Sequence, residues 1–153
     1  MKVIFKLIAN VCYFFYGYEG INVLFKMTPS KVTVEILKKY GAVIGENVRI
    51  QAPLIIHNAD QSKNLFANLT IGDDCYIGRD CIIDLMGIIH IGNNVTISHR
   101  AILNTHTNAG NSPVSKNRLK NTVGGISISD GAYLGLNVTV LESVSIGENC
   151  IVG

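Results

Sequence analysis

Charge, aromatic side chains and proline are all scarce in this 153-residue sequence. Only 16% of the residues are charged and 7% are aromatic, three are proline and none is tryptophan. The charged fraction lies below the roughly one quarter that is usual in globular proteins, whereas 48% of the residues are hydrophobic, enough for one domain with an ample core. The formal net charge of +2 gives no reason to expect nucleic acid as a partner.

Several chemical signatures are also missing. The sequence has no Walker loop, no dinucleotide-binding GxGxxG motif and no nucleophile elbow. It has no CxxC pair and no visible signal cleavage site, so the expected location is a reducing cytoplasm. The charge-free apolar run at 7–18 has only 12 residues. That is too short to span a bilayer, which needs about 20.

What the sequence does have is a hexapeptide repeat. Between residues 71 and 103, six-residue blocks begin with Ile or Leu, often have Gly second and Asn or Asp fourth, and have a small or apolar residue fifth. With insertions allowed, the frame extends over most of the chain, and every first position is Ile, Leu or Val. These positions are Ile44, Ile50, Ile56, Ile71, Ile77, Ile83, Ile91, Ile97, Leu103, Ile128, Leu134, Val140, Ile146 and Val152.

A period of six fits neither a helix nor one long strand, but it fits a short strand followed by a bend. Gly at the second position and Asn or Asp at the fourth are expected to tolerate the unusual backbone angles of such bends. Three sides close one coil, and stacked coils form three parallel sheets around an aliphatic core. Cys75, Cys81 and Cys150 occupy fifth positions and are expected to be core thiols.

These repeats resemble those of the left-handed parallel β-helix acyltransferases, in particular the sugar and polysaccharide O-acetyltransferases. The resemblance implies an all-β solenoid over residues 41–153, its left-handedness and a homotrimer with active sites between subunits. Relatives continue beyond the point equivalent to Gly153 with further coils and a capping tail. We therefore expect the last coil of this sequence either to continue or to be covered by something else.

Residues 1–40 form a separate helical segment in this prediction. Within 1–27, the apolar run is flanked by Lys2, Lys6 and Lys26, and two interpretations stay open. The segment is a helix packed on the solenoid or on a neighbouring subunit, or it lies on an anionic membrane such as the inner membrane surface. A second short helix follows, with Thr28 as its cap, Pro29 first and Gly41 after its end.

Three insertions interrupt the repeats, and we expect them to be loops on the outside of the solenoid. They lie at 60–69, around His90 and at 106–125. The last is the longest, and long loops on a rigid scaffold often carry the chemistry. His106 opens it among polar residues, whereas His57 and His90 are expected to be solvated or capping residues and His99 to face outward at the surface or a subunit contact.

The resemblance assigns roles to several of these residues. His106 matches, by its context, the histidine that acts as general base on the acceptor hydroxyl, although many relatives have a second histidine where this sequence has Asn108. Asp84, Asn104 and Asn108 are the expected acceptor-binding residues. The donor, acetyl-CoA, is expected to meet the backbone N–H groups of Gly135 and Leu136 and the loop residues Gly125, Lys116 and Arg118.

The resulting hypothesis is direct acetyl transfer from acetyl-CoA to a sugar hydroxyl, with His106 as base and no covalent intermediate. Two alternatives stay open. One is a structural solenoid without catalysis. The other is a zinc carbonic anhydrase, since these enzymes share the fold, but the histidine spacings of 33, 9 and 7 residues do not suit their three-histidine site, so we expect no metal.

Overall fold

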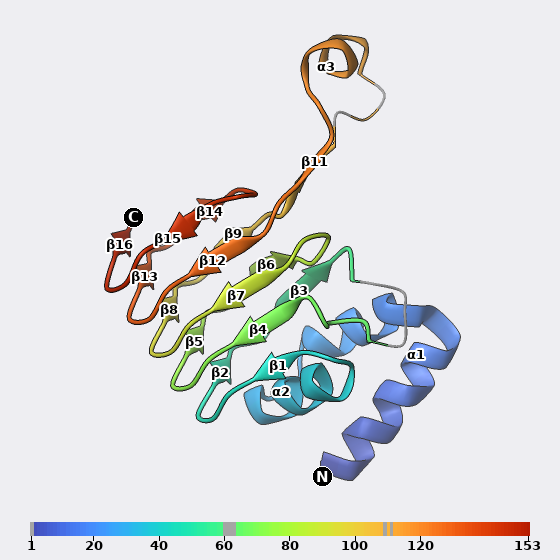
Figure 1. The fold of residues 1–153 in the computed structure, drawn as a ribbon. Coiled ribbons are helices and arrows are strands. Elements are labelled where there is room, and N and C mark those ends of the chain that lie inside the picture. The colour runs from blue at the N-terminus through green and yellow to red at the C-terminus, as the bar shows by residue number, and fades with distance from the viewer. Residues whose placement is uncertain (1, 60–63, 109, 111) are drawn as a thin grey trace.

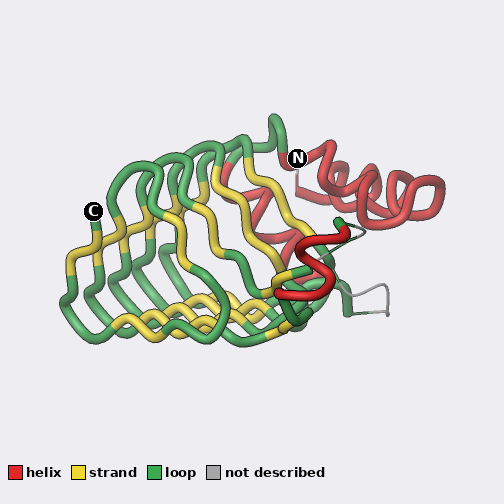
Figure 2. Tube along the Cα trace, turned by 90° about the horizontal axis from the view of Figure 1, so that it is seen from above, coloured by secondary structure: helices red, strands yellow, loops and turns green. Residues whose placement is uncertain are grey.

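The computed structural model describes residues 2–59, 64–108, 110 and 112–153. Short strands stack in parallel along one axis to form the three sides of a prism, and two helices cover its N-terminal end (Figures 1 and 2). This is the parallel β-helix that the repeats predicted, with the left-handedness that the resemblance implied. The insertions lie between consecutive strands, so each leaves the prism at one of its corners.

Each side of the prism is one sheet with one strand from each coil. The first sheet consists of β1 (Val43–Ile44), β4 (Leu69–Ile71), β7 (Ile89–Ile91), β12 (Ile126–Ile128) and β15 (Ser145–Ile146). The second consists of β2 (Arg49–Ile50), β5 (Tyr76–Ile77), β8 (Thr96–Ile97), β13 (Tyr133–Leu134) and β16 (Ile151–Val152). The third consists of β3 (Leu54–His57), β6 (Cys81–Asp84), β9 (Ile102–Leu103) and β14 (Thr139–Val140).

The first residues of the hexapeptides form the core. They pair in register from coil to coil, as in Ile44↔Ile71 and Ile83↔Leu103. Thirteen of the fourteen are buried, and the remaining one, Val152, is half-buried. Burying an aliphatic side chain of this size contributes about 1.5–3 kcal/mol, so a column of them along each sheet holds the coils together.

The corners confirm one half of the bend prediction and correct the other. Asp74, Asp80, Asn94, Asn137 and Asn149 all have φ between 55° and 59°, the left-handed region that Asn and Asp tolerate best. None of the second-position glycines has a positive φ. They are needed because the next coil passes close by, so that a Cβ at residue 72 lies 2.7 Å from the Gly92 carbonyl carbon.

Helix α1 (Lys2–Phe25) and helix α2 (Ser30–Lys39) close the N-terminal end of the prism (Figure 2). Ile21, Phe25, Ile36 and Leu37 are fully buried there, because both helices place an apolar face on the first coil. Gly17, with φ 60° and ψ −149°, kinks α1. In the described part of the chain, no helix has the length and apolar character needed to cross a membrane.

The cap of α2 differs from the prediction. Pro29 rather than Thr28 is the N-cap residue, and no side chain caps it. The Thr28 hydroxyl instead lies 2.8 Å from the Thr33 hydroxyl. At the other end the prediction is confirmed, since Gly41 follows the helix with φ 107°.

The sequence predicted that the first insertion is a loop on the outside of the solenoid, but part of it belongs to the core. Residues 60–63 lie outside the described part, but Leu65 and Phe66 are buried under the helices. The Phe66 ring lies 5.9 Å from that of Phe25. The insertion therefore helps to cap the open end of the core.

Two further positions correct the sequence analysis. His90 lies within strand β7, in register with Thr70, and the extra residues of the second insertion lie before that strand. Cys75 and Cys81 are buried, as expected, but Cys150 is exposed. Its coil is the last in the structure, so no further coil covers it.

The third insertion projects from the prism (Figure 1). It leaves as β10 (His106–Thr107), carries the short helix α3 (Pro113–Arg118) and returns as β11 (Thr122–Val123). The two strands form an antiparallel pair in which His106 faces Val123. The predicted loop is therefore a hairpin, and His106 lies in its first strand.

Candidate active site

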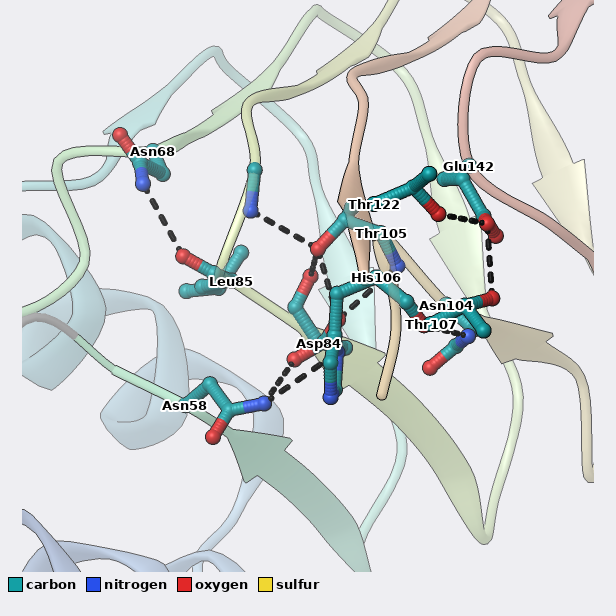
Figure 3. Close-up of polar contacts among 11 residues, drawn as sticks. Asn58, Asn68, Asp84, Leu85, Asn104, Thr105, His106, Thr107, Thr122 and Glu142 are labelled. Atoms are coloured by element: carbon teal, nitrogen blue, oxygen red, sulfur yellow. Dashed lines mark hydrogen bonds and ion pairs between the residues drawn. The ribbon is translucent and has the colours of Figure 1, made fainter. Parts of the chain in front are cut away.

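His106 and Asp84 form a close pair at the base of the hairpin (Figure 3). The distance between His106 Nδ1 and Asp84 Oδ2 is 2.7 Å. The His106 side chain is 19% exposed, whereas that of Asp84 is only 2% exposed. The imidazole therefore has one edge fixed in the protein and the rest of the ring nearer to solvent.

Asp84 is held from several directions. Asn58 Nδ2 donates to Oδ1 at 2.7 Å, and the Thr105 N–H donates to Oδ2 at 2.9 Å. The Thr105 hydroxyl lies 2.7 Å from Oδ2 and accepts from the N–H of Gly87. Burial acts to raise the pKa of Asp84, but the hydrogen bonds from His106, Thr105 and Asn58 outweigh it and lower the pKa below its ordinary value. The carboxylate is thus ionised and fixed.

The repeat explains why these residues meet. Asp84 directly follows the core residue Ile83, and β6 pairs with β3 so that Asp84 lies beside His57 of the preceding coil. His106 starts the next strand after the same corner one coil later. The His57 ring is exposed, and its centroid is 6.1 Å from that of His106.

The other two expected acceptor-binding residues lie on either side of His106. Asn104 Nδ2 donates to the His106 carbonyl at 2.6 Å and so supports the hairpin strand. Asn108 is exposed, and its side-chain oxygen accepts from the Gly110 N–H. The resemblance assigned Asp84 to the acceptor as well, but in the structure both of its oxygens bind groups of the chain itself.

Glu142, which sequence reasoning did not single out, fixes the hairpin. Its Oε1 accepts from Thr107 on β10 and from Thr122 on β11, each at 2.7 Å (Figure 3). These hydrogen bonds lower the pKa of Glu142. Its Oε2 is buried and, within the described part of the chain, has no hydrogen-bond partner.

The residues expected to meet acetyl-CoA do not form one cluster around His106. Gly135 and Leu136 follow β13 at the corner between the second and third sheets, whereas His106 leaves the corner between the third and first. The Gly135 N–H donates to the Val152 carbonyl at 2.7 Å, so in this structure it is not available to a thioester. Leu136 is exposed.

Of the loop residues, Gly125 lies nearest to His106, because Val123 of β11 pairs with His106. Gly125 lies just after β11, and its carbonyl accepts from the Ser143 N–H at 2.9 Å. Arg118 is exposed at the end of α3, and the side chain of Lys116 lies outside the described part. A hollow of about 640 Å³ lies beside α2 and is lined by Ser30, Lys31, Arg49 and Tyr76 among others, but not by His106 or Asp84.

The remaining histidines have other contacts. His99 Nδ1 accepts from the Arg79 N–H at 2.9 Å, so this exposed side chain joins two coils at a corner. His90 is exposed on β7. Among the described residues, no three His, Cys, Asp or Glu side chains come together as metal ligands would.

Comparison with known proteins agrees with this architecture. Residues 68–98 and 125–153 match the family model described as the hexapeptide repeat of succinyl-transferase. A galactoside O-acetyltransferase of Lactococcus lactis is 30% identical over 146 residues, which cover 88% of this chain and 64% of that protein. This chain therefore spans a little under two thirds of that relative's length.

Two crystal structures share the fold. A hexapeptide-repeat containing acetyltransferase of Vibrio cholerae superposes with a TM-score of 0.71 at 15% identity, covering 96% of this chain and 76% of that one. A structure of a hexapeptide-repeat containing acetyltransferase of Vibrio cholerae in complex with acetyl coenzyme A superposes with a TM-score of 0.69 at 18% identity. The match covers 86% of this chain and 68% of that one. By its repeats and its three parallel sheets, the chain has the left-handed parallel β-helix fold that these hexapeptide-repeat proteins share.

Proposed function

We propose that this protein is an acetyl-CoA-dependent acetyltransferase that modifies a hydroxyl group of a sugar or polysaccharide precursor. The observation that supports it most directly is the 2.7 Å contact between His106 Nδ1 and the buried Asp84 carboxylate. The relatives support the substrates: one is named a galactoside O-acetyltransferase, and another was crystallised with acetyl coenzyme A.

In this proposal Asp84 fixes the tautomer of His106 that can act as a base. A carboxylate only accepts hydrogen bonds, so the contact requires the proton of the neutral imidazole to be on Nδ1. The lone pair is then on Nε2, the atom that takes the proton of the acceptor hydroxyl. Asp84 also stabilises the positive charge that His106 acquires. Its role is to position and stabilise the base rather than to touch the acceptor.

The transfer needs no covalent enzyme intermediate. His106 Nε2 removes the hydroxyl proton while the hydroxyl oxygen attacks the carbonyl carbon of the acetyl thioester. A carbon–oxygen bond forms, the carbon–sulfur bond breaks, and His106 returns the proton to the departing coenzyme A sulfur.

We propose further that a homotrimer completes the site. Within one chain, Gly135 and Leu136 lie at a different corner of the prism from His106, so in this proposal a second copy brings a corner of its own to the hairpin. In a trimer each interface is heterologous, which means that it joins two different surfaces of the subunit, and three copies close into a ring. Light scattering that gives a monomer at assay concentrations contradicts this part of the proposal.

A coenzyme A release assay over a panel of sugars, amino sugars and nucleotide sugars tests the chemistry. His106→Ala should lower kcat by about 10²- to 10⁴-fold on the best acceptor, the usual contribution of a positioned base. His99→Ala is the matched control, because His99 is exposed and joins coils away from the hairpin. Near-normal turnover by His106→Ala, or loss of turnover by His99→Ala alone, refutes the assignment.

The alternative of a structural solenoid makes a different prediction for the donor. A ligand that binds only the folded state stabilises it by about 2.7 kcal/mol at one hundred times its dissociation constant. Coenzyme A at millimolar concentration should therefore raise the melting temperature of the enzyme. No shift in the wild type favours the structural role, and zinc at one equivalent in the purified protein favours the carbonic anhydrase alternative.

A further inference from the structure

Helix α1 carries an apolar stripe that stays exposed in the described chain. The stripe consists of Ile4, Leu7, Ile8, Val11, Phe14 and Phe15, and each of these residues is between 39% and 81% exposed. Their spacing of three and four residues places them on one face of the helix. Single exposed apolar residues are ordinary, but a contiguous stripe of six marks an interaction surface.

The opposite face of the same helix is already used. Ala9 is fully buried, and the Tyr13 ring lies 5.4 Å from that of Tyr40 at the end of α2. Lys6 pairs with Glu35 of α2 at 2.8 Å. Helix α1, which lies at the outer edge of the molecule (Figure 1), is thus attached to α2 on one face and leaves the stripe on its other face exposed.

Charge distinguishes the possible partners. Residues 1–40 contain six lysines and two glutamates, whereas residues 41–153 contain seven basic and nine acidic residues. Residues 1–18 contain no acidic residue at all. Two copies of such a segment repel each other, but an anionic surface attracts it. The charge pattern therefore favours a lipid surface over a second copy of this chain.

The aromatic residues point the same way. Phe14, Phe15 and Tyr16 are consecutive and more than two thirds exposed, just before the kink at Gly17. Aromatic side chains next to lysines are typical of helices that lie at the boundary between headgroups and acyl chains. After the kink, the helix returns to the solenoid, where Asn22 exchanges hydrogen bonds with the backbone of Ile56 at 2.7 Å and 3.0 Å.

We propose that α1 binds an anionic phospholipid surface through this stripe and lies in the plane of the interface. Since α2 covers its other face, the helix enters the lipid only on the stripe side. The link from Asn22 to β3 then holds the solenoid at that surface. This proposal is independent of the chemistry at His106.

The absence of tryptophan allows a direct test with the full chain. Phe15→Trp introduces one fluorophore into the stripe, and Tyr133→Trp introduces one at an exposed site on the solenoid as the control. Vesicles of phosphatidylcholine with about 30% phosphatidylglycerol serve as the anionic surface, and pure phosphatidylcholine as the neutral one. We expect a blue shift and quenching by brominated lipid for Phe15→Trp on anionic vesicles only.

Flotation with the same vesicles measures the binding itself. The double variant Phe14→Ser and Phe15→Ser should partition about tenfold more weakly or worse, because two inserted rings are lost, and salt at about 0.5 M should weaken the wild type. Circular dichroism of the variant establishes that it folds. Three results overturn the proposal: no blue shift, an equal shift in Tyr133→Trp, or a Phe15→Trp shift that follows protein concentration without vesicles. The last assigns the stripe to a second copy.

Discussion

Replacing Asp84 with asparagine separates two roles for this residue, acceptor binding and positioning of His106. The two side chains have nearly the same shape, so packing is preserved. At Oδ2, the carboxylate faces His106 Nδ1, the Thr105 N–H and the Thr105 hydroxyl, and at Oδ1 it faces Asn58 Nδ2. The amide of Asp84→Asn therefore keeps its oxygen towards His106 and turns its NH₂ group towards Asn58. Rotation of the Asn58 amide relieves that donor–donor contact.

The expected cost follows from this geometry. The variant keeps a hydrogen bond to His106 but loses its charge, and a charge-assisted hydrogen bond contributes about 1.5–3 kcal/mol. That stabilisation is largest when His106 carries the transferred proton, so we expect kcat to fall by about 10- to 100-fold. KM for the acceptor should change little, because the Asp84 side chain is only 2% exposed. Steady-state kinetics with the best acceptor measures both constants.

The same variant also tests the pH dependence of stability. The folded-state pKa of Asp84 lies below its ordinary value of 3.8, so its ionised form stabilises the fold above that pH, and this contribution disappears as pH falls through the folded pKa. The free energy of unfolding of the wild type should therefore fall more steeply below about pH 4 than that of Asp84→Asn. Urea denaturation at a series of pH values shows the difference.

Asp80→Asn is the matched control for both measurements, because Asp80 is an exposed corner residue whose φ of 59° also suits asparagine. It should leave kcat and KM unchanged. If Asp84→Asn instead raises KM for the acceptor and leaves kcat intact, Asp84 contacts the acceptor, as the family resemblance implied, and our reasoning is wrong.

The register of the solenoid could be predicted from the sequence because a six-residue period admits one regular geometry. Once Ile83 and Leu103 are both first positions, stacking them in adjacent coils follows, and β6 and β9 do pair in this way. The two kinds of corner residue were harder to separate. The conformation of an Asn or Asp corner is local, but the need for glycine at residue 72 arises from the neighbouring coil, which is contributed by residues 20 positions away.

The candidate site was predicted in part. His106 was singled out as the candidate base from its place at the start of the long insertion. Its contact with Asp84 was not predicted, because the resemblance assigned that acidic residue to the acceptor. The signal was present in the repeat: His57, Asp84 and Asn104 each follow a first-position residue of the third sheet. Such residues stack at one corner of the prism. Asn58 occupies the position after that corner and was missed.

What the sequence could not reveal depends on contacts between distant segments. Leu65 and Phe66 lie in an insertion without periodicity, and only their burial against Phe25 shows that they belong to the core. Glu142 follows a repeat corner with no special motif, yet it joins both strands of the hairpin. In both cases the partner is an irregular segment, for which the hexapeptide frame makes no prediction.

Two further predictions concern the glycine corners and the hairpin. Gly72→Ala should lower the free energy of unfolding by about 1–3 kcal/mol in chemical denaturation, because the added Cβ meets the backbone of the next coil at 2.7 Å. Gly147→Ala, at the equivalent position, should change that free energy by less than about 0.5 kcal/mol, because the nearest atom to the added Cβ is 3.5 Å away. Equal effects of the two substitutions exclude close approach as the reason for glycine. The last prediction is that Glu142→Ala loosens the hairpin that carries His106. One carboxylate oxygen holds both of its strands, so hydrogen exchange and tryptic cleavage after Arg118 should accelerate, with Thr122→Val intermediate because it removes only one of the two bonds. The contact of His106 with Asp84 also holds β10, so kcat of Glu142→Ala should fall less than that of Asp84→Asn. If hydrogen exchange in Glu142→Ala is unchanged, Glu142 does not hold the hairpin, and the reasoning is wrong.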